Sequence, residues 1–199
     1  MPTRRRLLAL PAALWTATLP ALLPPRAHAA TSPVDLTRPN VVVVLRHARA
    51  PGVGDPAGFR LDDCATQRNL SAGGREQARK LGERWKAAGF RPTQVLTSAW
   101  CRCQDTARLI GLGPVRVEPM LNSFFGSDAA ARDAQIKRLS RYIDQLDPRG
   151  GPYLLVTHQV VVTALTGHDA DSGGGVTIEL PVAGQARRVT VLPAPEVAD

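Results

Sequence analysis

Two histidines and two arginines stand where a parallel sheet would bring them together. Arg46 and His47 directly follow a run of four valines and a leucine, and His158 directly follows a second apolar run. Arg102 lies in a predicted helix that begins just after a third, shorter apolar run. In open parallel sheets the carboxyl ends of the strands share one edge, and such folds bind their ligands there. The spacing therefore predicts one site that contains all four side chains.

Imidazole and guanidinium groups in one site suit phosphoryl transfer through a covalent phosphohistidine. A neutral imidazole is a competent nucleophile when a hydrogen bond holds its second nitrogen. Arginine forks neutralise phosphoryl oxygens with bidentate geometry, so the pattern predicts a site that needs no metal and no other cofactor. A metal hydrolase that uses His47, His158 and an aspartate is the alternative, and it predicts inhibition by chelators.

The elements that must position these residues alternate between strands and helices. The apolar run 41–45 has neither a helical stripe nor alternation, which is typical of a strand buried on both faces. Helices are expected from Ser71 to about Gly89, from Ser98 to Ile110, at 130–146 and at 159–166. Further strands are expected at 94–97, 115–117 and 153–157. A hairpin is expected of strands 176–180 and 187–192, with its turn at Gly184. This order predicts an α/β fold, a three-layer α/β/α sandwich whose central sheet is mostly parallel, with helices on both faces and an antiparallel edge hairpin.

A long loop over residues 48–70 separates the first strand from the first helix. Loops of this length in a single domain are usually functional. The chain has three cysteines, so either one disulfide joins Cys64 to Cys101 or to Cys103, or all three thiols are free. The Cys-x-Cys spacing of the last two has no second metal-spaced pair, which disfavours a zinc site.

The N-terminus has the order of a cleaved signal peptide. A basic start is followed by an apolar stretch, and Ala-His-Ala precedes Ala30. The arginines at 4–6 also fit the twin-arginine route, with general secretion as the alternative. Prolines within the stretch disfavour a stable membrane-spanning helix. We therefore expect a signal peptide at 1–29, a flexible leader at 30–39 and a single domain at 40–199, in a protein that is periplasmic or secreted.

Composition fits a globular domain that acts on a small anionic substrate. Of the 199 residues, 44% are hydrophobic and 21% are charged. Four of the 25 Lys and Arg residues lie in the expected signal peptide, and the other 21 oppose 17 acidic residues. The resulting net charge of +4 is too mild to favour nucleic acid as a partner.

Four blocks in order resemble the histidine phosphatase superfamily, which also contains the phosphoglycerate mutases. Leu45-Arg46-His47-Ala48 is similar to its strand that ends in Arg-His-Gly, with Ala in place of Gly. Residues 70–78 resemble its Leu-Thr-x-x-Gly-x-x-Gln-Ala helix start, and residues 98–107 its Ser-x-x-x-Arg-x-x-x-Thr-Ala segment. Val-Thr-His at 156–158 resembles the strand end that carries its second histidine. The resemblance spans about residues 40–165.

This resemblance implies a phosphoglycerate mutase-like fold and a metal-independent exported phosphatase. His47 would be the nucleophile that accepts the phosphoryl group, and His158 would stabilise that group during transfer. Arg46 and Arg102 would clamp its oxygens, while Arg49 either reaches the phosphate or faces solvent. The substrate would be a phosphomonoester or a related phosphate, and an envelope glycan phosphate is one candidate.

The chain departs from the family at the proton donor. Residues 121–123 read Leu-Asn-Ser where many members have Leu-Asn-Glu, and Gln159 follows the second histidine where other branches have an acid. General acid catalysis is worth roughly 10²–10⁴-fold for a leaving group of high pKa. Three loop carboxylates could substitute: Asp55, Glu118 and Asp128. If none of them donates the proton, either the leaving group departs without protonation or the chain is a non-catalytic phosphate-binding or interaction domain.

Overall fold

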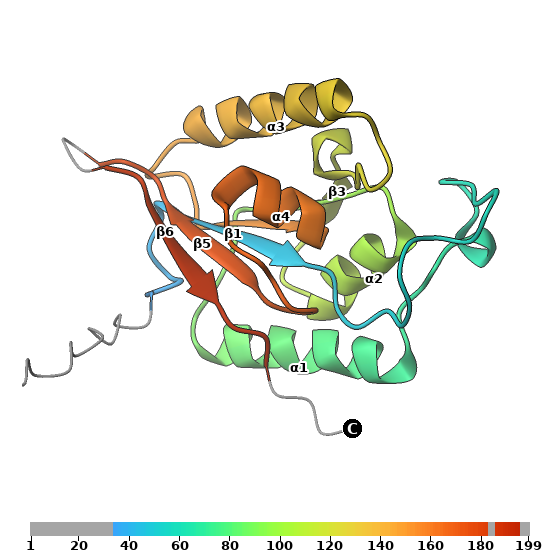
Figure 1. The fold of residues 1–199 in the computed structure, drawn as a ribbon. Coiled ribbons are helices and arrows are strands. Elements are labelled where there is room, and N and C mark those ends of the chain that lie inside the picture. The colour runs from blue at the N-terminus through green and yellow to red at the C-terminus, as the bar shows by residue number, and fades with distance from the viewer. Residues whose placement is uncertain (1–33, 183–185, 196–199) are drawn as a thin grey trace, which may run out of the picture. The chain divides into compact units, whose positions relative to one another are not determined.

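A six-stranded mixed sheet forms the centre of the protein (Figure 1). The computed structural model describes residues 34–182 and 186–195, so the expected signal peptide and Gly184 lie outside the described residues. The strands are β1 (Val41–Arg46), β2 (Gln94–Thr97), β3 (Val115–Val117), β4 (Tyr153–Thr157), β5 (Gly175–Glu179) and β6 (Arg188–Leu192). Their order is β3-β2-β4-β1-β5-β6. The first four are parallel, and β5 and β6 are antiparallel, which confirms a mostly parallel sheet with an edge hairpin.

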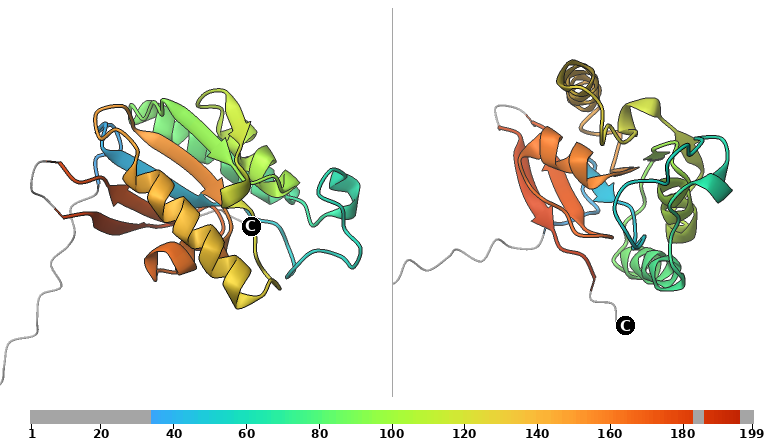
Figure 2. Two further views of the ribbon diagram at one scale, coloured as in Figure 1. Left: turned by 90° about the horizontal axis from the view of Figure 1, so that it is seen from above. Right: turned by 45° about the vertical axis from the view of Figure 1, so that its right-hand side comes forward.

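In the part of the chain that the structure describes, four α-helices cover the two faces of this sheet. They are α1 (Ala72–Ala87), α2 (Cys101–Ile110), α3 (Ala129–Asp144) and α4 (Gln159–Thr166), with short 3-10 turns η1 (Cys64–Thr66) and η2 (Pro119–Leu121). Helices α1 and α2 lie on one face and α3 and α4 on the other (Figures 1 and 2). Among the described residues no helix is both long enough and apolar enough to cross a bilayer.

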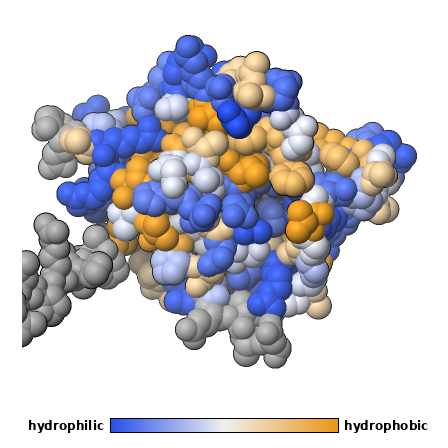
Figure 3. All heavy atoms as spheres, viewed as in Figure 1, coloured by the Kyte–Doolittle hydropathy of each residue, from blue (hydrophilic) through white to orange (hydrophobic). Residues whose placement is uncertain are grey.

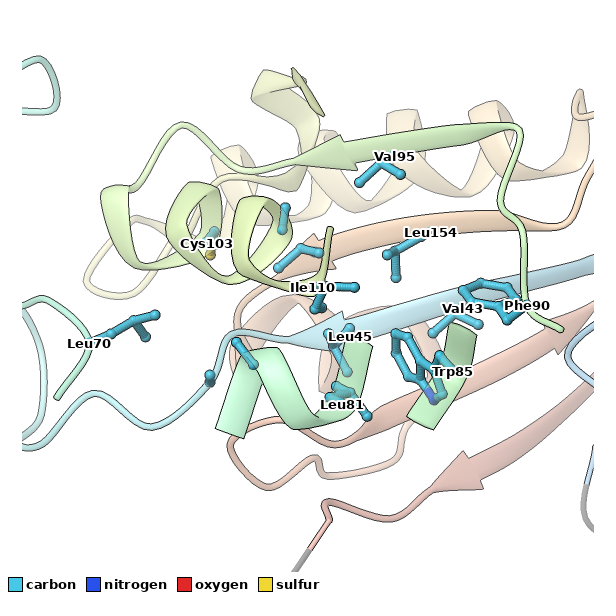
Figure 4. Close-up of a cluster of buried hydrophobic side chains, with 14 of the residues drawn as sticks. Val43, Leu45, Leu70, Leu81, Trp85, Phe90, Val95, Cys103, Ile110 and Leu154 are labelled. Atoms are coloured by element: carbon cyan, nitrogen blue, oxygen red, sulfur yellow. The ribbon is translucent and has the colours of Figure 1, made fainter. Parts of the chain in front are cut away.

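The valine run of β1 supplies both halves of the core. Val43 and Leu45 pack with Leu81 and Trp85 of α1 and with residues of α2 (Figure 4), whereas Val44 faces the layer of α3 and α4. All five apolar residues of the run have no exposed surface. This double burial explains why the run is continuously apolar rather than alternating.

Strand pairing places the predicted chemistry at one edge of the sheet. Arg46 on β1 pairs with Thr157 on β4, so His47 and His158 each lie one residue beyond adjacent strands. The His47 backbone N–H donates to the Thr157 carbonyl over 2.9 Å, and the Ser98 N–H donates to the carbonyl that precedes Thr157 over 3.0 Å. The parallel register therefore fixes the relative positions of His47, Ser98 and His158 along the strand direction.

Two segments differ in detail from the sequence-based expectation. Helix α2 begins at Cys101, three residues later than expected, because Trp100 is extended and the Ser98 side chain is engaged elsewhere. Within the expected leader, residues 34–39 form turns, and Val34 and Leu36 pack against the core.

The loop between β1 and α1 is stapled to α2. We call residues 50–69 the strap; it runs outward beside the carboxyl edge of the sheet (Figure 1). A disulfide joins Cys64 of the strap to Cys101, the first residue of α2, with 5.7 Å between their Cα atoms. The side-chain carbonyl of Gln67 also accepts the Cys101 backbone N–H over 3.0 Å. The strap is thus fixed next to the helix turn that carries Arg102.

Candidate active site

His47 is a buried, neutral imidazole, and one of its two nitrogens has no hydrogen-bond partner within the described part of the chain. Its side chain is 2% exposed, and Nδ1 lies 2.8 Å from the Ala48 carbonyl oxygen. A carbonyl oxygen only accepts, so Nδ1 carries the proton and Nε2 holds the lone pair. Burial, followed by the nearby guanidinium groups, lowers the pKa of His47 to about 3. At neutral pH the side chain is therefore a neutral nucleophile in one fixed tautomer, with its lone pair on Nε2.

His158 is held by a chain of hydrogen bonds whose direction is determined. Its ring centroid lies 5.5 Å from that of His47, and its Nε2 lies 2.8 Å from Ser98 Oγ. Asn122 Oδ1 accepts the Ala99 backbone N–H over 2.8 Å, so this atom is an oxygen, and Ser98 Oγ donates to it over 3.2 Å. Since the serine proton is committed to Asn122, Ser98 Oγ accepts the proton on His158 Nε2.

The other nitrogen of His158 faces a cation. Nδ1 lies 3.4 Å from an Arg102 guanidinium nitrogen, which is a donor and can only meet a lone pair. Burial, and then the proximity of His47 and Arg102, lowers the pKa of His158 well below its ordinary value. His158 is therefore neutral and helps to orient Arg102.

Arg102 and Asp55 form a buried bidentate pair. Their side chains are 3% and 8% exposed, and the two N–O distances are 2.8 and 3.2 Å. The Asp55 carboxylate also accepts the Trp100 indole N–H and the Arg68 backbone N–H, each over 3.0 Å. Burial raises the pKa of Asp55, but these hydrogen bonds and Arg102 outweigh it, and the pKa is lowered. Asp55 is therefore a carboxylate at neutral pH that fixes the Arg102 guanidinium.

Glycines allow Asp55 to reach this position. Gly52 and Gly54 have φ values of 89° and 70°, in the left-handed region that other residues adopt at a cost. The Arg68 guanidinium holds the same turn, since Nε donates to the Gly54 carbonyl over 2.6 Å and another nitrogen donates to the Ala50 carbonyl. The turn thus folds the strap back over the strand end.

These groups line a cavity of about 330 Å³ at the carboxyl edge of the sheet. Its lining includes both histidines and three arginines: His47, His158, Arg46, Arg68 and Arg102. Arg46 donates to the Ala170 carbonyl over 2.8 Å, and burial lowers the pKa of its guanidinium. Within the described residues the Nε–H groups of Arg46 and Arg102 have no acceptor. Each guanidinium thus keeps one buried N–H donor without a partner among the described residues, beside a cavity that both side chains line.

The structure separates the three candidate acids. Asp55 lines the cavity, whereas Glu118 lines a different cavity beside Arg138. Asp128 is the N-cap of α3 and accepts the Ala131 backbone N–H over 2.8 Å. Ser123 and Gln159, the residues at the two family positions for an acid, also line the cavity. Among the described lining residues, Asp55 is therefore the one carboxylate, and it is ionised.

Of the two places that the sequence leaves open for Arg49, the structure favours the solvent-exposed one. Arg49 is exposed, and the described lining of the cavity does not include it. Its backbone is held against α1, where Gln77 accepts its N–H over 2.9 Å and a Cβ at Gly74 would lie 2.0 Å from its carbonyl oxygen. Arg68, which sequence reasoning missed, lines the cavity instead. Its one sequence signal is its place just before the Leu-Ser helix start.

The third cysteine lies against the site but is not reactive. Cys103 is a free, fully buried thiol, and its Sγ lies 3.4 Å from His158 Nε2. Burial raises its pKa to about 12, so it stays protonated. Within the described residues there is no group of three or more His, Cys, Asp or Glu side chains placed to hold a metal ion.

Comparison with known proteins gives a family and a fold. A model of the histidine phosphatase superfamily (branch 1) matches residues 42–133. No curated protein matches the sequence. A putative alpha-ribazole-5'-P phosphatase from Escherichia coli K-12 superposes with a TM-score of 0.59 at 19% identity, over 80% of this chain and 98% of that one.

Two further solved structures share this fold at similarly low identity. The protein histidine phosphatase SixA, complexed with tungstate, gives a TM-score of 0.56 at 20% identity over 77% of this chain and 97% of that one. A mycobacterial glucosyl-3-phosphoglycerate phosphatase in complex with VO3 gives 0.56 at 19% identity, over 78% and 100%. The match over residues 42–133, which contain His47 and Arg102, and the fold shared with these solved structures support the assignment of the chain to the histidine phosphatase superfamily.

Proposed function

We propose that the protein is a phosphatase that hydrolyses a small phosphorylated substrate through a covalent intermediate on His47. One observation carries this proposal: the Nδ1 proton is committed to the Ala48 carbonyl, which leaves the Nε2 lone pair at a cavity lined by three arginines. A neutral nucleophile beside fixed cations is what attack on an anionic phosphoryl group requires.

The reaction proceeds in two displacements. In the first, His47 Nε2 forms a bond to phosphorus while the bond to the leaving oxygen breaks and its electron pair stays on that oxygen. In the second, a water oxygen attacks phosphorus, the P–N bond breaks, and its electron pair returns to Nε2 as the water proton passes to solvent. Arg46 and Arg102 neutralise the phosphoryl oxygens in both steps. Asp55 and His158 keep the Arg102 guanidinium in place.

The carboxylate of Asp55 restricts the leaving group. General acid catalysis needs a protonated group, and the lowered pKa of Asp55 keeps it ionised. Ser123 and Gln159 cannot supply a carboxylic proton in its place. We therefore assign to the enzyme substrates whose leaving group is stable as an anion, such as aryl phosphates, which release a phenolate, or phosphoric anhydrides, which release a phosphate.

Two of the structurally similar proteins support a small phosphorylated substrate. They are a putative alpha-ribazole-5'-P phosphatase and a glucosyl-3-phosphoglycerate phosphatase. An envelope glycan phosphate, the candidate from the sequence, fits less well, because its sugar hydroxyl would have to leave as an alkoxide of high pKa without a general acid. Export of the protein is part of this proposal, and the Cys64–Cys101 disulfide supports it because such bonds persist in oxidising compartments.

Hydrolysis of 4-nitrophenyl phosphate by the purified protein tests the proposal. We expect turnover, inhibition by tungstate, and a phosphoryl label on the denatured enzyme that acid releases and alkali does not. His47→Ala should remove both turnover and label, while the matched control His168→Ala, at an exposed histidine, should retain them. Full turnover by His47→Ala would refute the covalent mechanism. Tungstate binding without any turnover would favour the second candidate, a non-catalytic phosphate-binding domain, which the absence of a protonated acid already suggests.

A further inference from the structure

Exposed hydrophobic side chains gather at the mouth of the catalytic cavity. Val53, Phe59 and Phe125 are 89%, 37% and 64% exposed, and all three line this cavity. They come from two segments far apart in the sequence, the strap and the loop before α3. Exposed apolar side chains that converge on one opening mark a binding surface rather than chance exposure.

A larger groove between α3 and α4 adjoins the catalytic cavity, and Phe124 of its lining directly precedes Phe125 of the mouth. Its volume is about 940 Å³, and it shares Gln159 and Val160 with the catalytic cavity. Its floor carries apolar side chains that include Phe124, Ile136 and Ala164. In Figure 3, hydrophobic residues gather in the upper half of the view, in the region of α3 and α4.

The charges that border the groove do not favour a polyanion. The Arg132 guanidinium is bound to the Asp133 carboxylate at 3.0 Å, and Asp169 accepts the Thr163 hydroxyl over 3.0 Å. Lys137 and Arg141 also line the groove, so three cationic and two acidic side chains border its apolar residues.

We propose that the substrate is amphiphilic: its leaving group carries an apolar tail that crosses the mouth at Phe125 and lies in the groove between α3 and α4. This inference rests on the proposed function. In-line displacement puts the leaving group on the side of phosphorus away from His47 Nε2. His47 lies at the buried end of the cavity, so the leaving group points toward the apolar mouth.

Binding of non-hydrolysable phosphonates tests the inference without catalysis. Full burial of one methylene is worth roughly a fourfold change in Kd, and an open groove retains about twofold for each. The butyl group adds four carbons, so we expect 4-butylbenzylphosphonate to bind about 15-fold more tightly than benzylphosphonate in calorimetric titrations. The same ratio is expected in kcat/KM for 4-butylphenyl phosphate over phenyl phosphate, whose leaving groups are chemically alike.

Two substitutions localise the tail. Phe125→Ser removes the apolar side chain of the mouth that the tail would cross, and Ala164→Trp fills the groove from an exposed position on α4. Each should bring the ratio of the two Kd values close to one. Val191→Ser, at a half-exposed position on β6, and Ala134→Trp, on an exposed position of α3 outside the groove lining, are matched controls that should keep the ratio.

The outcomes separate this inference from the proposed function. Equal Kd values for the two phosphonates, a preference that survives both Phe125→Ser and Ala164→Trp, or binding of neither phosphonate would overturn the amphiphilic substrate. A preference that both substitutions abolish, in a protein that hydrolyses no aryl phosphate, would overturn the phosphatase and leave the apolar groove established.

Discussion

Replacing Asp55 by Asn tests whether this carboxylate positions Arg102 or donates a proton. Asp55 accepts two hydrogen bonds from Arg102 and one each from Trp100 and the Arg68 backbone. An amide turns one of its two terminal atoms into a donor, which faces guanidinium or indole N–H groups that also donate. The substitution therefore removes the charge and about half of the hydrogen bonds.

The expected loss of stability follows from the burial of this pair. Breaking a buried ion pair by removing one partner costs about 3–5 kcal/mol. Because the amide keeps part of the contacts, we expect Asp55→Asn to lower the free energy of unfolding by about 3 kcal/mol and Tm by roughly 6–12 °C. Asp62→Asn is the matched control on the strap, since the Asp62 side chain is 90% exposed, and it should change neither quantity measurably.

Kinetics distinguish the two roles of Asp55. A displaced Arg102 that forfeits one charge-assisted hydrogen bond, about 1.5–3 kcal/mol, lowers kcat/KM by about 10–150-fold. A positioning role predicts the same loss for 4-nitrophenyl and phenyl phosphate, because Arg102 contacts the phosphoryl group and not the leaving group. The assay compares kcat/KM of the wild type and Asp55→Asn on both substrates. If Asp55→Asn spared 4-nitrophenyl phosphate but slowed phenyl phosphate by about 10²–10⁴-fold, Asp55 would be the general acid and this reasoning would be wrong.

Three further predictions concern pH, the disulfide and metals. Folding lowers the pKa values of His47 and His158, so the unfolded chain binds more protons than the folded chain below pH 6.5. The free energy of unfolding should therefore fall below pH 6.5 by roughly 1 kcal/mol per pH unit for each histidine. A denaturation midpoint that stays constant between pH 6.5 and 4.5 would contradict their burial as neutral groups. The Cys64–Cys101 disulfide spans 37 residues, so Cys64→Ser should lower the free energy of unfolding by about 3–4 kcal/mol, and equal Tm values with and without reductant would argue against the bond. Aryl phosphate turnover after dialysis against a chelator should match that of untreated enzyme, and a loss restored by added metal would favour a metal hydrolase.

The sequence determined the sheet and the two ends that carry the histidines. The runs 41–45 and 153–157 are continuously apolar because both faces of β1 and β4 are buried, and this is a local signal. The residue after each run is then placed by the parallel register alone, which brings His47 and His158 to one edge. The Arg102 block follows the next strand in the same way. Sequence reasoning therefore reached these residues without knowledge of side-chain packing.

Only the tertiary structure decided which groups complete the site. The strap has no periodic pattern, so nothing local to it shows that Asp55 binds Arg102, that Arg68 lines the cavity, or that Cys64 pairs with Cys101 rather than Cys103. These contacts join residues more than thirty positions apart, and they depend on how the strap folds back over α2. The tautomers of the two histidines likewise follow from contacts with Ala48 and Ser98 that exist only in the folded chain. Hydrophobic periodicity specifies which segments are buried and in which order, whereas the partners of buried polar groups are chosen by three-dimensional packing.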